Sequence, residues 1–418
     1  DQPASGQQMA VGVGIMGALA AAASIWAYAN AGVGFSEGLP RPGLGFRQAM
    51  APATAQPVIV PAAFSAIGTT DALGDLPAAG KVFNVTAGGS SGDILVRLNY
   101  VGTPGPASLQ YKLTEDGTGN LITDWTTFTT SPNSGALYAI SAPRNTQNQA
   151  YNIQFRFGDQ PGVAVASSNA VMVGAVFMLD GQSLCEKLFS VTTGAASPNS
   201  RVRFFDNLTW GPVVGRGGVN LANKLNAAMN MPVALVVGYR AGISGTTISQ
   251  HLAATTIMNI NIQALNQIGN RIMMFNWQQG EGDASGGTST ETYQGRFYTD
   301  SNSVVKTIRA NAINGSANPN LPVAVNIIGR ADSGLGAGYT DANWENIRLA
   351  LNNAIATVPD CYLGAECVTV ENSGDGIHYS PAGFEVDSTW MARAWLKALA
   401  LVPYGSGATL SSITKIDA

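Results

Sequence analysis

The sequence has little charge, few cysteines and almost no histidine. Charged residues make up 11% of the 418 residues, the formal net charge is −4, and no run of basic residues occurs. Because nucleic acids are bound through clustered positive charge, this composition argues against a nucleic-acid partner. The two histidines and three cysteines do not fall into the spacing of a zinc site, so no metal and no cofactor are expected.

The low charge also bears on location. Soluble domains usually carry about 25% charged residues, and a weakly charged surface rich in hydroxyl and amide groups favours an extracellular or surface-associated protein, whether secreted, membrane-anchored or part of a particle. Cys361 and Cys367 are spaced to close a small disulfide in an oxidising compartment. Cys185 is then left over, and we expect it to face inward as a small apolar group.

Residues 1–35 form an apolar segment that is expected to be helical. No charged residue lies between Asp1 and Glu37, and residues 9–29 are almost entirely apolar, a length that fits a membrane-spanning helix. The basic start of a secretory signal is absent. Three interpretations stay open: a membrane anchor, a helix buried in a homo-oligomer or larger particle, and an unprocessed signal. Residues 9–34 are the predicted contact with a membrane or a multi-subunit assembly.

Two segments of different composition follow. Residues 36–62 are rich in Pro, Ala and Gly and predict a linker or extended arm. Residues 63–173 contain short alternating runs, such as 94–98 and 151–157, punctuated by turn-forming residues. This pattern predicts an immunoglobulin-like β-sandwich with Trp125 in its core. A spacer or packing role is favoured over carbohydrate binding, because no aromatic-rich face is evident.

From residue 174 onward, strand and helix patterns alternate. The expected strands are 176–179, 233–237, 272–275, 323–328 and 368–370, and the expected helices are 220–229, 249–268, 290–312, 341–358 and 381–401. Such alternation predicts an α/β domain over residues 174–401, with a doubly wound sheet covered by helices on both faces. Residues 402–418 form a C-terminal tail.

A serine follows the first of these strands. The apolar run 175–179 leads into Asp180-Gly181-Gln182-Ser183, and the carboxyl end of a strand is where open α/β sheets place their chemistry. A lone serine at this position is more often only a helix N-cap. Two later stretches change that interpretation: Trp277-Gln278-Gln279-Gly280-Glu281-Gly282-Asp283, and an Asp-x-x-His formed by Asp375 and His378.

Together the three stretches resemble the SGNH hydrolases, in particular the sialate O-acetylesterase and acetylxylan-esterase branch. Gly181-Gln182-Ser183 matches the nucleophile motif, Trp277 with Gln279-Gly280-Glu281 and Asp283 matches the mid-chain motif, and Asp375 with His378 matches the late one. The resemblance covers roughly residues 174–401. It implies a three-layer domain that acts as a serine esterase and removes O-acetyl groups from a carbohydrate or polysaccharide.

Acyl transfer assigns a role to each of these residues. Ser183 is the expected nucleophile, His378 the base that takes and returns its proton, and Asp375 the group that orients the imidazole. His251 is the rival histidine. It lacks an aspartate in Asp-x-x-His spacing, so a surface or capping role is favoured for it.

The tetrahedral intermediate also needs hydrogen-bond donors for its oxyanion. The backbone N–H of Ser183 is one candidate. The resemblance adds the backbone of Gly245, where glycine permits close approach, and the carboxamide of Gln279. Three further residues are expected either to contact substrate or to brace loops: Gln182, Glu281 and Asp283.

Two departures from the motifs concern the alcohol that leaves. Leu184 stands where the branch usually has Asn, and Gly282 where it has Ser or Thr. The alternative to a working esterase is a structural or receptor-binding component of a surface assembly or virus-like particle. In that case a carbohydrate-engaging esterase head trims capsule or is vestigial.

Overall fold

A parallel sheet is the centre of the C-terminal part of the chain. The computed structural model describes residues 60–65, 76–86, 89–103, 107–159, 166–312, 320–331, 335 and 338–401. The sheet order is β11-β10-β12-β9-β13-β14-β15. All neighbours from β10 to β15 pair in parallel, and only β11 at the edge pairs antiparallel. These strands are β9 (Ala166–Gly181), β10 (Val202–Asp206), β11 (Thr209–Pro212), β12 (Val233–Val237), β13 (Met274–Gln278), β14 (Val323–Ile327) and β15 (Cys361–Glu366).

Helices connect these strands. They are α1 (Ser183–Ser190), α2 (Arg216–Met229), α3 (Thr256–Gln267), α4 (Glu281–Ser285), α5 (Thr290–Gln294), α6 (Val304–Asn311), α7 (Asp341–Thr357) and α8 (Pro381–Leu401). Short turns of other helix types are η1 (Arg240–Gly242), η2 (Ile248–His251), η3 (Gly295–Thr299) and η4 (Cys367–Thr369). Hydroxyl groups cap several of them; the Thr340 side chain, for example, accepts the Asn343 N–H at the start of α7.

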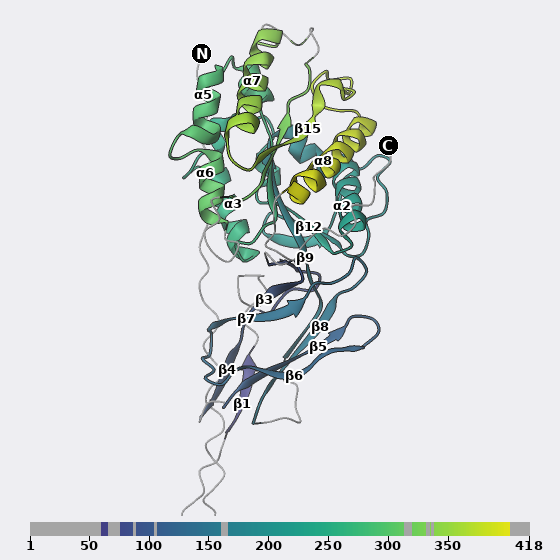
Figure 1. Cartoon of the computed structure of the whole chain (residues 1–418), viewed down its shortest axis with the longest axis vertical. Helices are drawn as coiled ribbons and strands as arrows, with labels where there is room; N and C mark the ends of the chain where they lie inside the picture. Colours follow the sequence, from purple (N-terminus) through teal and green to yellow (C-terminus); the bar gives the residue numbers. More distant parts are fainter. Residues whose placement is uncertain are drawn as a thin grey trace, which may run out of the picture. The chain divides into compact units, whose positions relative to one another are not determined.

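The helices cover both faces of the sheet. Alternate residues of β9 belong to two hydrophobic clusters, because successive side chains of a strand point to opposite faces. Phe177 packs with residues of α1, α2 and α8, whereas Val176 packs with residues of α3, α6 and α7. Figure 1 shows these two sets of helices on opposite sides of the sheet. The predicted α/β layering of this region is confirmed.

Some predicted elements are interrupted. The helix expected at 290–312 is three pieces, α5, η3 and α6, because the polar run from Asp300 to Ser303 leaves the helical conformation before α6 begins. The helix expected at 249–268 is divided between η2 and α3. The strand predicted at 368–370 is wrong, since the strand lies earlier, at β15, and η4 follows it.

Antiparallel strands make up most of the part before β9, and β2 alone among those described pairs in parallel, with β9. They are β1 (Val60–Ser65), β2 (Val82–Asn84), β3 (Ser91–Arg97), β4 (Asn99–Thr103), β5 (Leu109–Glu115), β6 (Leu121–Thr129), β7 (Leu137–Pro143) and β8 (Tyr151–Phe157). Within this part β1 pairs with β4, β3 with β7, and β5 with both β6 and β8. The immunoglobulin-like arrangement of these strands stays a prediction. Trp125 is not in a core as predicted: it is half-buried, with the Arg156 guanidinium 4.1 Å from its ring centroid.

One strand joins the two parts. The first residues of β9 pair with β8 and β2, and residues from Ala175 on pair with β12 and β13. The predicted boundary between residues 173 and 174 therefore lies inside a continuous strand. Its carboxyl end, where Ser183 follows, points away from the antiparallel strands (Figure 1).

The three cysteines are free and buried. Cys361 begins β15 and Cys367 directly follows its end, so an extended strand of about 20 Å separates them, far beyond the ~7 Å that a disulfide spans between Cα atoms. The disulfide suggested by their spacing is therefore not formed. Cys185 faces inward as predicted and has no exposed surface.

The predicted N-terminal helix (1–35), most of the linker and the tail at 402–418 lie outside the described residues; the last residues of the predicted linker belong to β1. Among the helices that the structure describes, none is both long and apolar enough to cross a bilayer.

Candidate active site

Ser183 stands at the carboxyl end of β9 as the first residue of α1. The β9 and β13 backbones approach each other so closely here that a Cβ on Gly181 would lie 2.0 Å from the Gln278 carbonyl oxygen. The Ser183 residue is 5% exposed, and its hydroxyl makes no hydrogen bond with the described residues. As the first helical residue, its backbone N–H also has no acceptor within the helix. The serine therefore offers a free hydroxyl and a free N–H in the same place.

Asp375 and His378 form a hydrogen-bonded pair in the loop before α8. The His378 Nδ1–H donates to Asp375 Oδ2 at 2.7 Å. The other Asp375 oxygen accepts the backbone N–H groups of Ile377 at 3.1 Å and His378 at 2.9 Å, and the Ser373 hydroxyl at 2.8 Å. His378 Nε2 is buried without a hydrogen-bond partner among the described residues. With Nδ1 protonated toward Asp375, Nε2 is left as the acceptor that a general base needs.

The charge of Asp375 is well stabilised. Burial acts to raise the pKa of this carboxyl, but the hydrogen bonds from His378, Ser373 and Ile377 outweigh it and hold the pKa well below its usual range. Asp375 therefore stays ionised at any pH at which the protein would work.

The Asp375–His378 loop lies at the same edge of the sheet as Ser183. The Asn372 side chain donates to the Arg330 carbonyl, which follows β14, at 3.1 Å and to the Gly376 carbonyl at 3.0 Å. The carboxyl ends of parallel strands share one edge, so β9 presents Ser183 there as well. No hydrogen bond joins Ser183 to His378 in this structure.

The Gln182 side chain braces the loop that follows β13. Its Oε1 accepts the backbone N–H groups of Gly282 at 3.0 Å and Gly280 at 3.3 Å, together with the Gln279 amide at 3.1 Å. Its own amide nitrogen has no acceptor among the described residues. Gln182 thus holds the two segments together through its oxygen and keeps its donors free beside Ser183.

The Gln279 carboxamide is enclosed by protein groups. Gln279 has no exposed surface, and its Nε2 contacts Gln182 Oε1, the Thr246 carbonyl at 3.2 Å and Asp283 Oδ2 at 2.7 Å. Its Oε1 accepts the Tyr293 hydroxyl at 2.8 Å. Two N–H groups facing three acceptors have nothing left for a substrate. The prediction that Gln279 donates directly to the oxyanion is therefore not supported; the side chain positions the loop instead.

Gly245 lies in the exposed loop before η2. Its φ of +71° is the left-handed conformation that favours glycine, and a Cβ there would meet no atom within 4 Å. Its backbone N–H makes no hydrogen bond with the described residues. The next residue, Thr246, contacts Gln279 through its carbonyl. The loop is thereby joined to the same network as Gln182.

His251 is fully buried, so the predicted surface or capping role is wrong. Its Nδ1 bonds Asp180 Oδ2 at 3.0 Å and its Nε2 bonds Thr246 Oγ1 at 2.8 Å. Asp180 also accepts from Asn261 at 2.9 Å and from the Gly181 N–H at 2.8 Å. Both imidazole nitrogens are occupied, so His251 cannot serve as the base. This network fixes the turn before Ser183. In the sequence, the only sign of this network is Asp180, the aspartate that precedes Gly181.

The two acidic residues of the mid-chain motif differ in their surroundings. Asp283 braces the loop: it accepts the Ile248 N–H at 2.7 Å, the Gln279 amide and the Thr288 hydroxyl. Both oxygens of Glu281 are buried without a partner among the described residues. Burial, with a contribution from the charges of Asp387 and Asp283, raises the pKa of Glu281 to about 7.

The structure shows the surroundings of Leu184 and Gly282, the two residues that depart from the motifs. Leu184 is 1% exposed and belongs to the core under α1, so a polar residue at that position would have to be buried. A Cβ on Gly282 would lie 2.7 Å from the Thr246 carbonyl oxygen. In the part of the chain that the structure describes, no group of three or more His, Cys, Asp or Glu side chains is placed to hold a metal ion.

Comparison with solved structures identifies the fold. No protein-family model and no curated protein matches the chain. A carbohydrate acetylesterase from Xanthomonas citri superposes with a TM-score of 0.54 and 18% identity, over 81% of this chain and 77% of that one. The chain therefore shares the fold of this acetylesterase. A fold of this class was expected from the three short motifs.

Two further solved structures are less similar and cover about half of the chain. A protein from Arabidopsis thaliana has a TM-score of 0.43 and 17% identity, over 54% of this chain and 98% of its own. A carbohydrate acetylesterase from Sinorhizobium meliloti has a TM-score of 0.36 and 14% identity, over 55% of this chain and 100% of its own.

Proposed function

We propose that the protein is a serine esterase that removes O-acetyl groups from a carbohydrate or polysaccharide through Ser183, His378 and Asp375. Two observations together carry the proposal. Asp375 and His378 share a hydrogen bond of 2.7 Å, and His378 Nε2 has no hydrogen-bond partner among the described residues. A histidine held in this way, at the sheet edge that presents an unbonded serine hydroxyl, is equipped for acyl transfer. The acetylesterase activity named for the similar Xanthomonas citri protein supports the choice of acyl group.

The reaction proceeds in two halves. Ser183 Oγ attacks the acetyl carbonyl carbon while His378 Nε2 takes the hydroxyl proton, and Asp375 stabilises the resulting imidazolium. When the tetrahedral intermediate collapses, the sugar oxygen leaves with that proton and an acetyl-serine remains. Water then attacks the acetyl-serine, with His378 again accepting a proton and returning it to Ser183 as acetate departs.

The oxyanion requires donors that the protein itself does not use. The N–H of Ser183 at the start of α1 is one, and the helix amino-terminus favours negative charge there. The unbonded N–H of Gly245 is a second. The amide group of Gln182, which has no acceptor among the described residues, is the side-chain donor to the oxyanion, the role that the sequence assigned to Gln279. Gln279, Asp283 and the buried Asp180–His251 pair position these donors without touching the substrate.

Esterase activity can be tested directly. Acetate release from p-nitrophenyl acetate and from a panel of acetylated polysaccharides should be seen with the native chain and lost in Ser183→Ala, because triad members carry several powers of ten in rate. Ser190→Ala is the matched control, since Ser190 is exposed at the far end of the same helix. Equal activity of Ser183→Ala and Ser190→Ala would reject the proposal.

The alternative role, as a structural or receptor-binding component of a surface assembly, depends on residues 1–35, which lie outside the described residues. An extracellular or surface location is likewise proposed on composition alone, as are membrane, assembly and oligomer contacts through residues 9–34. No feature of the described residues favours that role over catalysis.

A further inference from the structure

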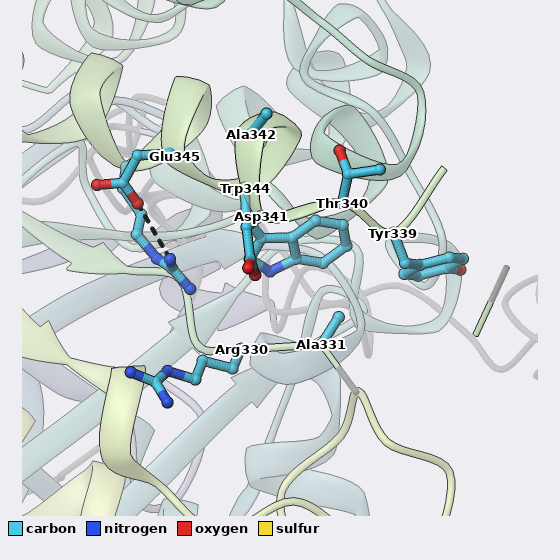
Figure 2. Close-up of a pocket in the computed structure, with 9 residues that line it drawn as sticks. Arg330, Ala331, Tyr339, Thr340, Asp341, Ala342, Trp344 and Glu345 are labelled. Atoms are coloured by element: carbon cyan, nitrogen blue, oxygen red, sulfur yellow. Dashed lines mark hydrogen bonds and ion pairs between the residues drawn. The ribbon is translucent and has the colours of Figure 1, made fainter. Parts of the chain in front are cut away.

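A cavity of about 550 Å³ opens beside the His378 loop, within the ~300–1,000 Å³ typical of small-molecule sites. It is formed by Arg330 and Ala331, which follow β14, and by residues around the start of α7. Figure 2 shows Trp344 between Glu345 and Tyr339, with Arg330 and Ala331 below them in the view. None of these lining residues has a role in the proposed triad or oxyanion site.

The cavity adjoins the Asp375–His378 loop and helix α4, which follows the loop that Gln182 braces. On one side Asn372 donates to the Arg330 carbonyl and to Gly376, which lies within the Asp375–His378 turn. On the other side the chain at Gly338 packs against α4, since a Cβ there would lie 2.4 Å from the Ser285 carbonyl oxygen. A ligand in the cavity would therefore lie beside the loop that carries Asp375 and His378.

Two aromatic rings line the cavity. The Tyr339 and Trp344 ring centroids are 5.5 Å apart with an interplanar angle of 34°. Trp344 is 3% exposed and its indole N–H has no partner in the described part of the chain, so packing rather than hydrogen bonding holds it. Tyr339 is half-buried. Tyr339, supported by the buried Trp344, supplies an apolar surface against which the C–H face of a pyranose packs.

The charged lining groups balance. Arg348 is occupied, because it donates to Glu345 at 3.1 Å and to the backbone carbonyls of Ile328 and Gly329. Arg330 and Asp341 are both exposed, and neither side chain has a hydrogen bond or ion pair with the described residues. The cavity thus offers one free donor group and one free acceptor group. Sugar hydroxyls donate and accept, and match this pair. Because the charges of the lining groups balance, the carboxylate of an acidic sugar gains no net attraction here.

We propose that this cavity is a subsite for a neutral sugar residue, next to the acetylated residue of a polysaccharide. The apolar face of the sugar packs on Tyr339, whose ring Trp344 supports from the protein side, and its hydroxyls bond Arg330 and Asp341. The flanking position rests on the proposed esterase function. Sugar binding itself does not, and it can be measured without catalysis.

The test is binding of unacetylated trisaccharides to the full chain, by calorimetry and ligand-observed NMR. The probes are xylotriose, mannotriose and cellotriose as neutral sugars, and trigalacturonic acid as a charged one. We expect at least one neutral probe to bind, and more tightly than trigalacturonic acid. Tyr339→Ala should weaken that binding about tenfold, and Tyr339→Phe, which keeps the ring, should restore it.

Arg330→Ala tests the polar contacts in the same assay and should also weaken neutral-sugar binding. Arg144→Ala is its matched control, because Arg144 is an equally exposed arginine just after β7, among the antiparallel strands. The proposal is overturned if no neutral probe binds, if trigalacturonic acid binds more tightly, or if Tyr339→Ala and Arg330→Ala bind as the native chain does.

Kinetics then separate the subsite from the esterase. With the acetylated form of the trisaccharide that binds, Tyr339→Ala should raise KM by about the factor found in binding and change kcat little. If no ester is hydrolysed but the sugar binding and its loss in the variants persist, the esterase proposal fails and the subsite stands. If p-nitrophenyl acetate is hydrolysed and no neutral sugar binds, the subsite fails and the esterase stands.

Discussion

His378 gives its Nδ1 hydrogen to Asp375 at 2.7 Å, while its Nε2 is left buried with no partner among the described residues. Unpaired buried nitrogens are costly and rare in folded proteins. In the proposed mechanism, the Ser183 hydroxyl is the partner that this nitrogen lacks.

Asp375→Asn should remove the tautomer control that this pair provides. The amide can donate to Nδ1, which favours the tautomer with the proton on Nε2, and Nε2 then cannot accept the Ser183 proton. We expect kcat to fall by roughly 10³–10⁴ with little change in fold. Asp159→Asn, at an exposed position just after β8, is the control. Acetate release within a few-fold of the native rate would exclude Asp375 as the orienting group.

The pH profile tests the base itself. Because His378 must be neutral to accept the Ser183 proton, kcat/KM on p-nitrophenyl acetate should fall as the pH is lowered from about 8 to about 5. The pKa of Asp375 lies well below its usual range, so Asp375 should add no second acid limb to the profile. A flat profile over this range would count against His378.

Gln279 variants distinguish positioning from direct catalysis. Gln279→Glu would place a carboxylate among three acceptors, Gln182 Oε1, the Thr246 carbonyl and Asp283 Oδ2, and should lower Tm more than Gln279→Ala does. Loss of activity should follow the loss of stability in both variants. If Gln279→Ala instead kept its Tm and lost only kcat, the side chain would be an oxyanion donor after all.

Glu281 should make stability depend on pH. Folding raises the pKa of this carboxyl from its ordinary 4.5 to about 7, so the folded chain binds more protons than the unfolded chain between those values. The free energy of unfolding must then fall as the pH rises through that window. Asp387, whose pKa burial raises to about 6, acts in the same direction.

Once the pH exceeds both pKa values, the ionised Glu281 lowers the free energy of unfolding by ~3 kcal/mol. Glu281→Gln removes this destabilisation. We expect a higher Tm than the native chain at pH ~8 and a much smaller difference at pH ~4. Glu291→Gln, on the exposed side of α5, is the control. An equal Tm change at both pH values would contradict the buried, protonated state of Glu281.

Elements with strong local signals were predictable from the sequence. The helix expected at 381–401 is α8 with the same bounds, because Pro381 suits a first helical turn and an apolar pattern follows it. The strand β14 differs from its prediction by one residue. The three motifs in their order likewise predicted a fold of the class that the chain shares with the Xanthomonas citri acetylesterase.

Contacts between distant residues were not predictable. His251 looked like a surface residue because its partner, Asp180, is 71 positions away. Gln279 looked like a free donor because nothing local shows that Thr246 and Asp283 enclose it. The cavity at Arg330 joins a strand end to a helix start, and no periodic pattern encodes that approach. These features depend on packing, which a single sequence shows only indirectly.

Covalent labelling tests the central claim, that Ser183 is an activated nucleophile, most directly. The native chain, Ser183→Ala and His378→Ala would each be treated with a fluorophosphonate, and the adduct would be located by peptide mass spectrometry. The account predicts one adduct, on Ser183, in the native chain and none in either variant, because labelling needs the serine and its base together. An adduct on another serine, or labelling of Ser183 at the native rate in His378→Ala, would contradict it.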